Sequence, residues 1–337
     1  MRLVKPSYEI IEQGPGLQGI YDIIERCGKT SYKSEPKGGE VAKRFVEARA
    51  KEKHGAVLEF GTVYLTVNDP IMSDDIGVSR AVCFYEDNPY SKAKYIGNNY
   101  YITTNYRVLV ENNRLDDLKY LCEPTEYHEK RYAVKFITDI GLGRDFLRHR
   151  VMSMVQESTR YVNYNKEKFG EQCTFVIPPW IDLPECEDLQ PWGEDWADMK
   201  ESKIIYRCSG SVTRTSAWLW ALHNAEKYYM KLTSDWSDTD WVPEEDKAPW
   251  QAQMAREVLP LATKSELVLC GFKDAWIHFF RLRSDIAATG KAHPMSIQLA
   301  NPLRDEFVER GYLTEEDLKH DLFEPFDIGI SDSNLKL

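Results

Sequence analysis

The sequence lacks the features that mark a membrane protein, a secreted protein or a zinc protein. No apolar run approaches the roughly 20 residues needed to span a bilayer, and the first residues contain no apolar stretch of the kind found in signal peptides. The seven cysteines are scattered and none forms a C-x-x-C pair, so we predict neither a disulfide framework nor a metal site. We therefore expect a cytoplasmic protein with reduced cysteines and no membrane partner.

Positive charge is also scarce. The chain has 43 Lys and Arg against 54 Asp and Glu, which gives a formal net charge of −11. This balance argues against nucleic acid as a partner, because binding to its backbone requires an excess of cations. Any anionic ligand has to be held by a local cluster of Arg or Lys within an acidic background.

Length and pattern predict one α+β domain. The chain has 337 residues, of which 42% are hydrophobic, and this is ample for a packed core. We predict one domain over residues 1–320, with surface insertions at about 68–130 and 165–215, and a C-terminal tail at 321–337. Helical and strand-like segments do not alternate as βαβ units, so we expect a mixed or antiparallel sheet with packed helices.

Hydrophobic periodicity predicts where these elements lie. Helices are expected at 16–27, 39–53, 141–154, 216–232, 250–258 and 273–284. Strands are expected at 57–67, 99–110, 131–138 and 266–270.

One short motif suggests dinucleotide binding but lacks the required context. Gly14-Pro-Gly16-Leu-Gln-Gly19 matches G-x-G-x-x-G and precedes a predicted helix. The residues after that helix, 28–39, do not form a second strand ending in an acidic residue. A glycine-rich turn into a helix is therefore the preferred interpretation.

The most informative feature is a cluster of cationic side chains. Arg148, His149 and Arg150 are consecutive at the end of a predicted apolar helix, which is an unusual place to concentrate charge. Each guanidinium offers a fixed fork of donors that suits phosphates and the carbonyl edges of planar rings. Ser158 and Arg160 add a hydroxyl and another fork, so the cluster predicts a nucleotide site. A solvated basic helix end is the structural alternative.

The spacing of this cluster resembles a known family. R-H-R followed by seven residues and Ser is the signature of the flavin-dependent thymidylate synthases (the ThyX family), and residues 148–158 match it. Further segments resemble the family in the same order: Cys27-Gly-Lys-Thr-Ser31-Tyr32, His54-Gly-Ala-Val-Leu-Glu59, Arg256-Glu-Val-Leu-Pro260-Leu261 and His278-Phe-Phe-Arg-Leu282-Arg283. The resemblance implies a ThyX-like fold.

The resemblance also implies an activity, its cofactors and an assembly. The activity is methylation of dUMP to dTMP, with 5,10-methylenetetrahydrofolate as the carbon donor and NADPH as the reductant of FAD. The implied assembly is a homotetramer with active sites at subunit interfaces. No cysteine has an obviously activating setting, so the uracil would be activated by electrostatics instead of thiol addition.

Roles carry over position by position from the resemblance. The residues implied to contact FAD or the flavin site are Arg148, His149, Arg150, Gln156 and His278. Those implied to bind substrate are Asp145, Arg148, Ser158, Arg160, Arg256 and Arg283. Those implied in catalysis are Arg283, which would stabilise the N3 anion of the uracil, Ser158 and His54.

Three of these residues have ordinary structural alternatives. Arg256 could be a surface residue of an amphipathic helix. Arg283 could cap the C-terminus of its helix, where the dipole favours a cation. His54 could be a structural histidine.

Four positions depart from the family pattern. Asp145 stands where the family has Gln, Gln156 where it has Glu (with Glu157 one place later), Phe60 where it has His, and Ala56 where it has Ser or Thr. Since Asp145 and Gln156 belong to the expected nucleotide pocket, the product stays open. A dUMP hydroxymethylase of the same fold is the near alternative, and a non-catalytic flavin- or nucleotide-binding homologue is the distant one.

Overall fold

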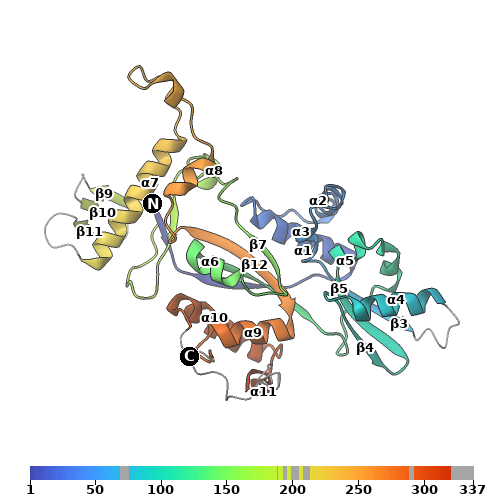
Figure 1. Ribbon diagram of the computed structural model, residues 1–337. Coiled ribbons are helices and arrows are strands. Elements are labelled where there is room, and N and C mark those ends of the chain that lie inside the picture. The colour runs from blue at the N-terminus through green and yellow to red at the C-terminus, as the bar shows by residue number, and fades with distance from the viewer. Residues whose placement is uncertain are drawn as a thin grey trace, which may run out of the picture. The chain divides into compact units, whose positions relative to one another are not determined.

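The computed structural model describes residues 1–68, 76–187, 189–192, 196–198, 205–207, 213–287 and 292–319 (Figure 1). The chain divides into two compact units, Met1–Ala275 and Trp276–Leu337. The single catalytic domain with two insertions stays a prediction, and the predicted tail at 321–337 lies outside the described residues.

The described ranges combine helices with short strands, which confirms the predicted α+β class. The strands are β1 (Arg2–Val4), β2 (Ser7–Ile11), β3 (Thr62–Asn68), β4 (Lys92–Ile96), β5 (Asn99–Asn105), β6 (Arg131–Asp139), β7 (Ser153–Gln156), β8 (Thr174–Val176), β9 (Gln190–Trp192), β10 (Trp196–Asp198), β11 (Ile205–Arg207) and β12 (Lys264–Phe272). The helices are α1 (Gly16–Thr30), α2 (Gly39–Lys51), α3 (Gly55–Leu58), α4 (Ile76–Asp87), α5 (Tyr106–Glu111), α6 (Ile140–Phe146), α7 (Arg214–Thr233), α8 (Ala252–Ala255), α9 (Lys273–Arg283), α10 (Pro294–Glu309) and α11 (Glu315–Lys319). None of these helices has both the length and the apolar character that a membrane span requires.

A four-stranded antiparallel sheet with the order β2-β6-β12-β7 organises the first unit. β6 and β12 pair along their whole length, from Asp139 opposite Lys264 to Arg131 opposite Phe272. Among the described strands, β7 pairs with β12 alone and is therefore an edge strand of this sheet. The antiparallel pairing confirms the sheet type that the sequence predicts.

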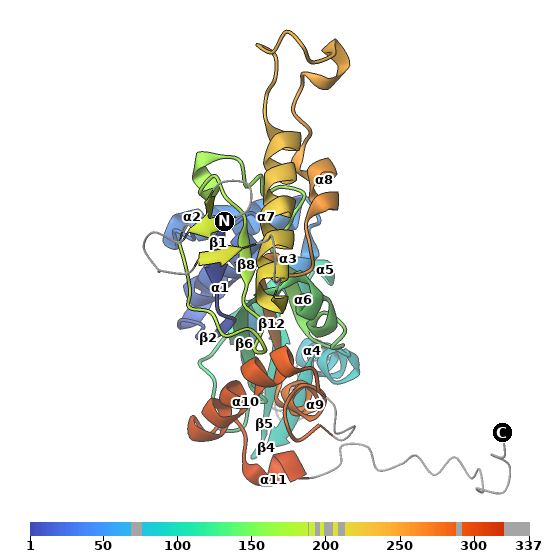
Figure 2. The ribbon, with the colours of Figure 1, turned by 90° about the vertical axis from the view of Figure 1, so that its left-hand side faces the viewer.

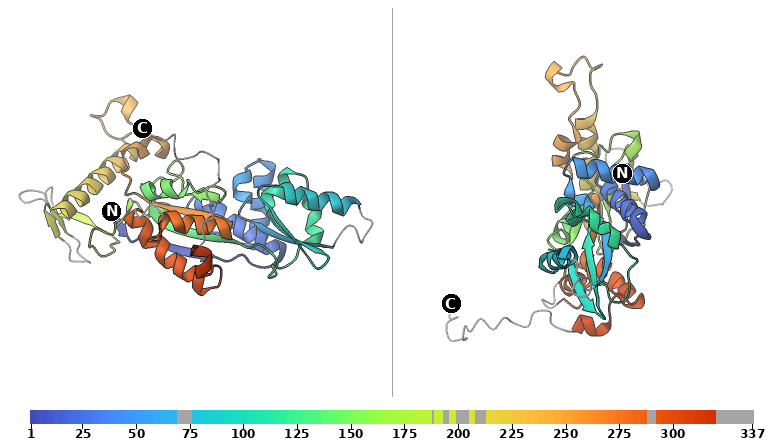
Figure 3. Two further views of the ribbon diagram at one scale, coloured as in Figure 1. Left: turned by 60° about the horizontal axis from the view of Figure 1, so that its bottom comes forward. Right: turned by 90° about the vertical axis from the view of Figure 1, so that its right-hand side faces the viewer.

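Helix α1 is buried on two sides, and this places it between two sheets of the first unit. Ile23 and Cys27 belong to one core cluster with Val268 of the central sheet. Ile20 and Ile24 belong to another cluster, formed with the antiparallel sheet β3-β5-β4 (blue to teal in Figure 3). The apolar spacing of α1 thus serves two cores, which fixes the end of α1 relative to the central sheet.

A third core cluster joins the N-terminus to helix α7. β1 pairs in parallel with β8 beside α7 (Figure 2). Leu3 and Phe175 of these strands belong to one core cluster with Leu219 and Leu222 of α7. The backbone of α7 begins with a capping box between Thr213 and Ser216.

The second unit contains an aromatic core. Trp276, Phe279 and Phe280 of α9 pack with Phe307 of α10, with ring centroids 5.2 to 6.1 Å apart. Such edge-to-face and tilted arrangements are favourable for aromatic rings. This cluster determines the position of the C-terminal end of α9 within the second unit.

The predicted helix at 141–154 is wrong in its second half. α6 ends at Phe146, and residues 153–156 form β7 instead. Pairing with β12 satisfies the backbone of this segment and outweighs the helical spacing of its apolar residues. The Arg148–Arg150 cluster consequently lies in the turn between α6 and β7 and not on a helix.

The predicted strand at 57–67 is wrong at its beginning. Residues Gly55–Leu58 form α3, and β3 starts at Thr62. Gly61 lies between the two elements, and a Cβ there would lie 2.7 Å from Cγ2 of Ile20. This link therefore packs closely on α1, which leaves no room for a side chain at position 61.

Two other predicted elements are divided. The strand at 99–110 ends at Asn105, whose side chain accepts a hydrogen bond from the Val108 N–H at 3.1 Å and caps α5. The helix at 250–258 becomes α8 followed by a 3₁₀ turn. The remaining predicted helices and strands are confirmed to within a few residues.

The G-x-G-x-x-G match is a tight turn and not a dinucleotide fingerprint. A Cβ on Gly19 would lie 1.8 Å from the carbonyl oxygen of Gly14, and Gly16 has a φ of +63°. Both positions thus require glycine for steric reasons. The preceding strand, β2, pairs antiparallel with β6, whereas the fingerprint requires a parallel βαβ unit.

The close contact of Gly19 with Gly14 predicts that Gly-to-Ala substitutions at positions 19 and 141 have opposite effects on stability. Gly19→Ala should destabilise the protein by about 1–3 kcal/mol because backbone must move. Gly141→Ala, a matched control in α6 whose Cβ would lie no closer than 3.4 Å to another group, should be neutral or stabilising by up to about 1 kcal/mol. Urea unfolding of both variants measures the difference, and equal effects would contradict the steric account.

Candidate functional site

The candidate site lies where β7 ends and the chain continues to Ser158. Gln156 is the last residue of β7. The Glu157 N–H donates to the carbonyl of Glu266 at 2.7 Å, and the Ser158 N–H donates to the carbonyl of Ser31 at 3.1 Å. The segment is therefore tied both to β12 and to the end of α1, and two cavities adjoin it.

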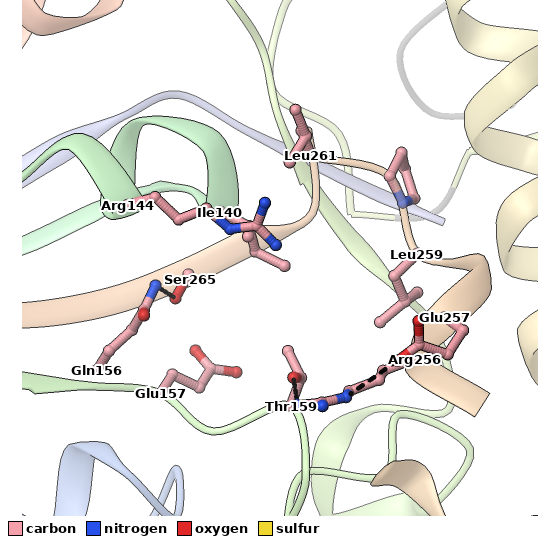
Figure 4. A pocket seen from close by; sticks show the side chains of 11 residues that line it. Ile140, Arg144, Gln156, Glu157, Thr159, Arg256, Glu257, Leu259, Leu261 and Ser265 are labelled. Atoms are coloured by element: carbon pink, nitrogen blue, oxygen red, sulfur yellow. Dashed lines mark hydrogen bonds and ion pairs between the residues drawn. The ribbon is translucent and has the colours of Figure 1, made fainter. Parts of the chain in front are cut away.

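The first cavity has a volume of about 390 Å³ (Figure 4). Its lining residues are Ile140, Arg144, Gln156, Glu157, Thr159, Arg256, Glu257, Leu259, Pro260, Leu261 and Ser265. Figure 4 shows the side chains of Arg144, from α6, and Arg256, from the 3₁₀ turn, extending toward it from different elements. The two guanidinium groups can donate to an anionic group such as a phosphate, and the same lining contains two carboxylates, Glu157 and Glu257.

Hydrogen bonds fix two polar side chains of the first cavity. The Gln156 amide nitrogen donates to Oγ of Ser265 at 2.9 Å, and Arg256 Nη1 donates to Oγ1 of Thr159 at 3.4 Å. A Cβ on Gly143 would lie 2.9 Å from the same Gln156 nitrogen, so glycine at 143 leaves room for this amide. The strand end thus presents a neutral amide where the family pattern has a carboxylate.

A buried network of charges lies beside the first cavity. Lys264 Nζ is 3.0 Å from Oε2 of Glu157 and also pairs with Glu266, which Lys135 contacts at 2.6 Å. Burial disfavours ionised Glu266, but the charges and hydrogen bonds of Lys264 and Lys135 outweigh it and lower the pKa of Glu266 to about 2. The second oxygen of Glu157, Oε1, accepts no hydrogen bond from any described residue.

The second cavity has a volume of about 470 Å³ and a cationic lining. Its lining residues are Gly28, Ser31, Tyr32, Phe45, Arg49, Lys53, His54, Gly55, Ala56, Val57, Arg107, Gln156, Ser158 and Tyr161. This set contains three permanent cations and no carboxylate. The ring centroids of Tyr32 and Tyr161 lie 5.5 Å apart, and the angle between the ring planes is 37°. The lining suits an anionic ligand that carries a planar ring.

Four of the predicted site residues line these cavities. Gln156 lines both, Arg256 lines the first, and His54 and Ser158 line the second. The side chain of His54 is 62% exposed, with its Nδ1 3.9 Å from Glu52. The side chain of Arg256 is 39% exposed, so its guanidinium is accessible at the cavity.

Five predicted residues line neither cavity. Arg148 and Arg150 are exposed in the turn after α6, where His149 is buried. Arg160 is exposed, and its guanidinium lies 5.7 Å from the ring centroid of Tyr161, a residue of the second cavity. The fifth is Asp145, a half-buried residue of α6.

The two remaining predicted residues, His278 and Arg283, belong to the second unit. Arg283 is the last residue of α9, and its carbonyl accepts a hydrogen bond from the Ser296 hydroxyl at 2.8 Å. A cation at this position is favoured by the helix dipole, so the capping alternative for Arg283 is physically reasonable. Its role in catalysis stays a prediction.

Sequence reasoning missed several lining residues. Arg144 lies one helical turn before the cationic cluster, and Tyr32 ends a segment already matched to the family, so position alone could have suggested both. Glu157 directly follows Gln156, but adjacency in the sequence does not by itself assign it to the first cavity. Arg49 and Arg107 belong to no recognised motif, and only the fold brings them to the second cavity.

Comparisons with known proteins identify the family of the chain. A family model described as thymidylate synthase complementing protein matches residues 125–307, just over half of the chain. The fold is similar to that of a UMP/dUMP methylase, PolB, from Streptomyces cacaoi bound with 5-Br dUMP (TM-score 0.38, 14% identity, 92% of this chain and 93% of that chain covered). It is also similar to Thymidylate Synthase X from Helicobacter pylori with FAD and dUMP (TM-score 0.36, 14% identity, 94% and 100% covered). No curated protein matches the sequence.

The charge network predicts a specific acid sensitivity. Since the pKa of Glu266 falls from 4.5 to about 2 on folding, its contribution to stability is present above pH 4.5 and is lost as pH falls toward 2. Glu266→Gln should lower the urea midpoint at neutral pH. Between pH 4.5 and pH 2, the midpoint of this variant should fall less than that of the wild type. Glu9→Gln, which removes an exposed partner of Arg26, is the control and should keep the wild-type decline. Parallel profiles for wild type and Glu266→Gln would contradict this assignment.

Proposed function

The chain belongs to the thymidylate synthase complementing protein family, the flavin-dependent thymidylate synthases, and from this premise we propose that it methylates dUMP to dTMP. The observation that carries the proposal is the position of the family signature in the structure. R-H-R-x7-S lies inside the matched range and ends at Ser158, at the strand end that adjoins both cavities. We further propose 5,10-methylenetetrahydrofolate as the carbon donor and NADPH as the reductant.

The described cysteines support chemistry without a thiol nucleophile. Burial raises the pKa of the thiols of Cys27, Cys122, Cys173 and Cys270. None of the residues that line the two cavities in the described part of the chain is a cysteine. Because the thiolate is the reactive form, these thiols are poor candidates for attack on C6 of the uracil.

Electrostatics would replace covalent activation of the pyrimidine. Arg283 would lie against the uracil edge and stabilise the N3 anion, which makes C5 electron-rich enough to accept the one-carbon unit. Arg256, Ser158 and Arg160 would bind the nucleotide, with the guanidiniums directed to its phosphate. Asp145 would contribute to the same pocket. The accessible guanidinium of Arg256 in the first cavity supports this placement.

The chain offers groups that fit a flavin nucleotide. The second cavity combines a pair of tyrosine rings with three permanent cations, which suits a planar ring system and a diphosphate. Arg148, His149 and Arg150 would hold the cofactor together with Gln156 and His278, and His54 would lie near it. When bound, the flavin supplies the hydride that converts the transferred one-carbon unit into a methyl group. These contributions would come together in a homotetramer.

Hydroxymethylation of dUMP is the second candidate. Both reactions begin with the N3 anion and transfer of the one-carbon unit, and they differ in whether hydride or water completes the product. Gln156 supports this candidate. It lines both cavities at the expected nucleotide site, and its neutral amide makes their polarity different from that of the Glu in the family pattern. The difference depends on how well the site excludes water.

Flavin binding is the first test. The purified protein should carry FAD or bind it with micromolar or better affinity, and its absorbance should bleach when NADPH is added. Absorbance spectra before and after anaerobic addition of NADPH measure both properties. A colourless protein that gains no flavin signal when incubated with FAD would contradict the proposed function.

Arg283→Lys tests the proposed catalytic role. Lysine keeps the charge but loses the planar fork, so turnover should fall roughly 100-fold while FAD content stays near normal. Arg281→Lys is a matched control on the same helix and should retain most activity. Wild-type turnover in Arg283→Lys would indicate that Arg283 is a helix cap.

Mass spectrometry of the product separates dTMP from the hydroxymethyl compound, which is heavier by one oxygen. A dominant hydroxymethyl product would select the second candidate.

A further inference from the structure

Arg107 lies outside the part of the chain that the family model matches, yet it lines the second cavity. It belongs to the short helix α5, in a segment that the sequence suggests is an insertion. α5 packs beside α3, which carries the cavity residues Gly55, Ala56 and Val57 (Figure 1). Arg107 is therefore a cation that this segment adds to a cavity also lined by the motif residues His54 and Ser158.

Two carboxylates hold the guanidinium of Arg107. Its Nη1 donates to Oε1 of Glu59 at 2.5 Å, and its Nε donates to Oε1 of Glu111 at 2.8 Å. Nη2 is left without a hydrogen bond to the described residues. Burial disfavours the cation, but the hydrogen bonds to Glu111 and Glu59 outweigh it and raise the pKa of Arg107. The fork is thus charged and fixed in orientation before any ligand arrives.

The two carboxylates do not line the second cavity. Glu59 and Glu111 line a separate cavity of about 230 Å³, whereas Arg107 lines both this cavity and the second one. Arg49 and Lys53 add two more cations to the second cavity. This lining holds three permanent cations and no carboxylate, but Arg107 pairs with Glu59 and Glu111 and Arg49 pairs with Glu52. The cavity therefore offers an anion hydrogen-bond donors rather than a net positive charge.

Gly55 allows this arrangement. A Cβ at Gly55 would lie 2.6 Å from Oε1 of Glu111 and 2.7 Å from Nε of Arg107. The hydrogen-bonded pair therefore packs directly on the backbone of α3. Any side chain at position 55 would displace the guanidinium from the cavity wall or break its bond to Glu111.

We propose that Arg107 is an anion-binding residue of the second cavity, where its fixed fork takes a phosphate or carboxylate group of a bound cofactor. Glu59 and Glu111 are positioning residues that hold the fork. The ligand class rests on the proposed function, which calls for a flavin with a diphosphate and a folate with carboxylates. The guanidinium suits both groups because its remaining nitrogen, Nη2, can donate a charge-assisted hydrogen bond to either.

Two pairs of ligands identify the anionic group. Dissociation constants would be measured by titration calorimetry for FAD against riboflavin, which lacks the phosphates, and for folic acid against its dimethyl ester, which lacks the charges. Arg107→Gln should weaken one of the charged ligands by about 10-fold or more, with less than about 2-fold change for its uncharged counterpart. The affected pair distinguishes a diphosphate from a carboxylate.

Further variants separate ligand binding from structure. Arg107→Lys keeps the charge without the fork and should recover only part of the affinity, and Glu111→Gln should weaken the same charged ligand by a smaller factor. Arg26→Gln, at an exposed pair outside both cavities, should bind all four ligands as wild type does. Thermal unfolding of each variant confirms that it is folded.

The possible results separate failure of the role of Arg107 from failure of the proposed function. Wild-type affinity of Arg107→Gln and Arg107→Lys for both charged ligands would overturn the role of Arg107 and leave the proposed function standing. Equal weakening of charged and uncharged ligands would also overturn it, because the residue would then be only structural. A wild-type protein that binds neither FAD nor folic acid would contradict the proposed function and this inference together.

Discussion

The pairing of β7 with β12 is the constraint on which the candidate site depends. It converts a segment with helical spacing into a strand, and so it moves the R-H-R cluster into a turn and places Gln156 at a strand end. The next residues are held by two backbone hydrogen bonds, one to β12 and one to the end of α1. α1 is itself buried between two sheets, so the anchor at its end is packed on both sides. Both cavities adjoin this short segment.

Charge is distributed around this segment in two different ways. Beside the first cavity, Glu157, Lys264 and Glu266 form a buried network in which opposite charges compensate one another. Around the second cavity the cations face the cavity, while the carboxylates that hold Arg107 line another one. An acidic chain can therefore turn several cationic hydrogen-bond donors toward one cavity while their carboxylate partners stay outside its lining. This arrangement is the physical basis for binding anionic ligands.

The sequence predicts the individual helices and strands better than the tertiary contacts between them. The α+β class, the central strands and α1, α2, α7 and α9 follow from local periodicity, and the family follows from the spacing of R-H-R and Ser158. β7 does not follow, because its conformation depends on pairing with a strand more than 100 residues away. Arg107 reaches the second cavity only through packing of α5 on α3, and the need for glycine at position 55 is visible only there. Long-range packing carries no local sequence signal.

The central claim is that the end of β7 is where the nucleotide binds. A crystal structure of the protein with FAD and 5-iodo-dUMP tests it most directly, because anomalous scattering locates the iodine, and hence C5 of the pyrimidine, independently of any model. The account predicts an iodine peak beside residues 156–159, with the phosphate within hydrogen-bond reach of Ser158 or Arg256. A single well-occupied peak remote from both cavities would contradict it.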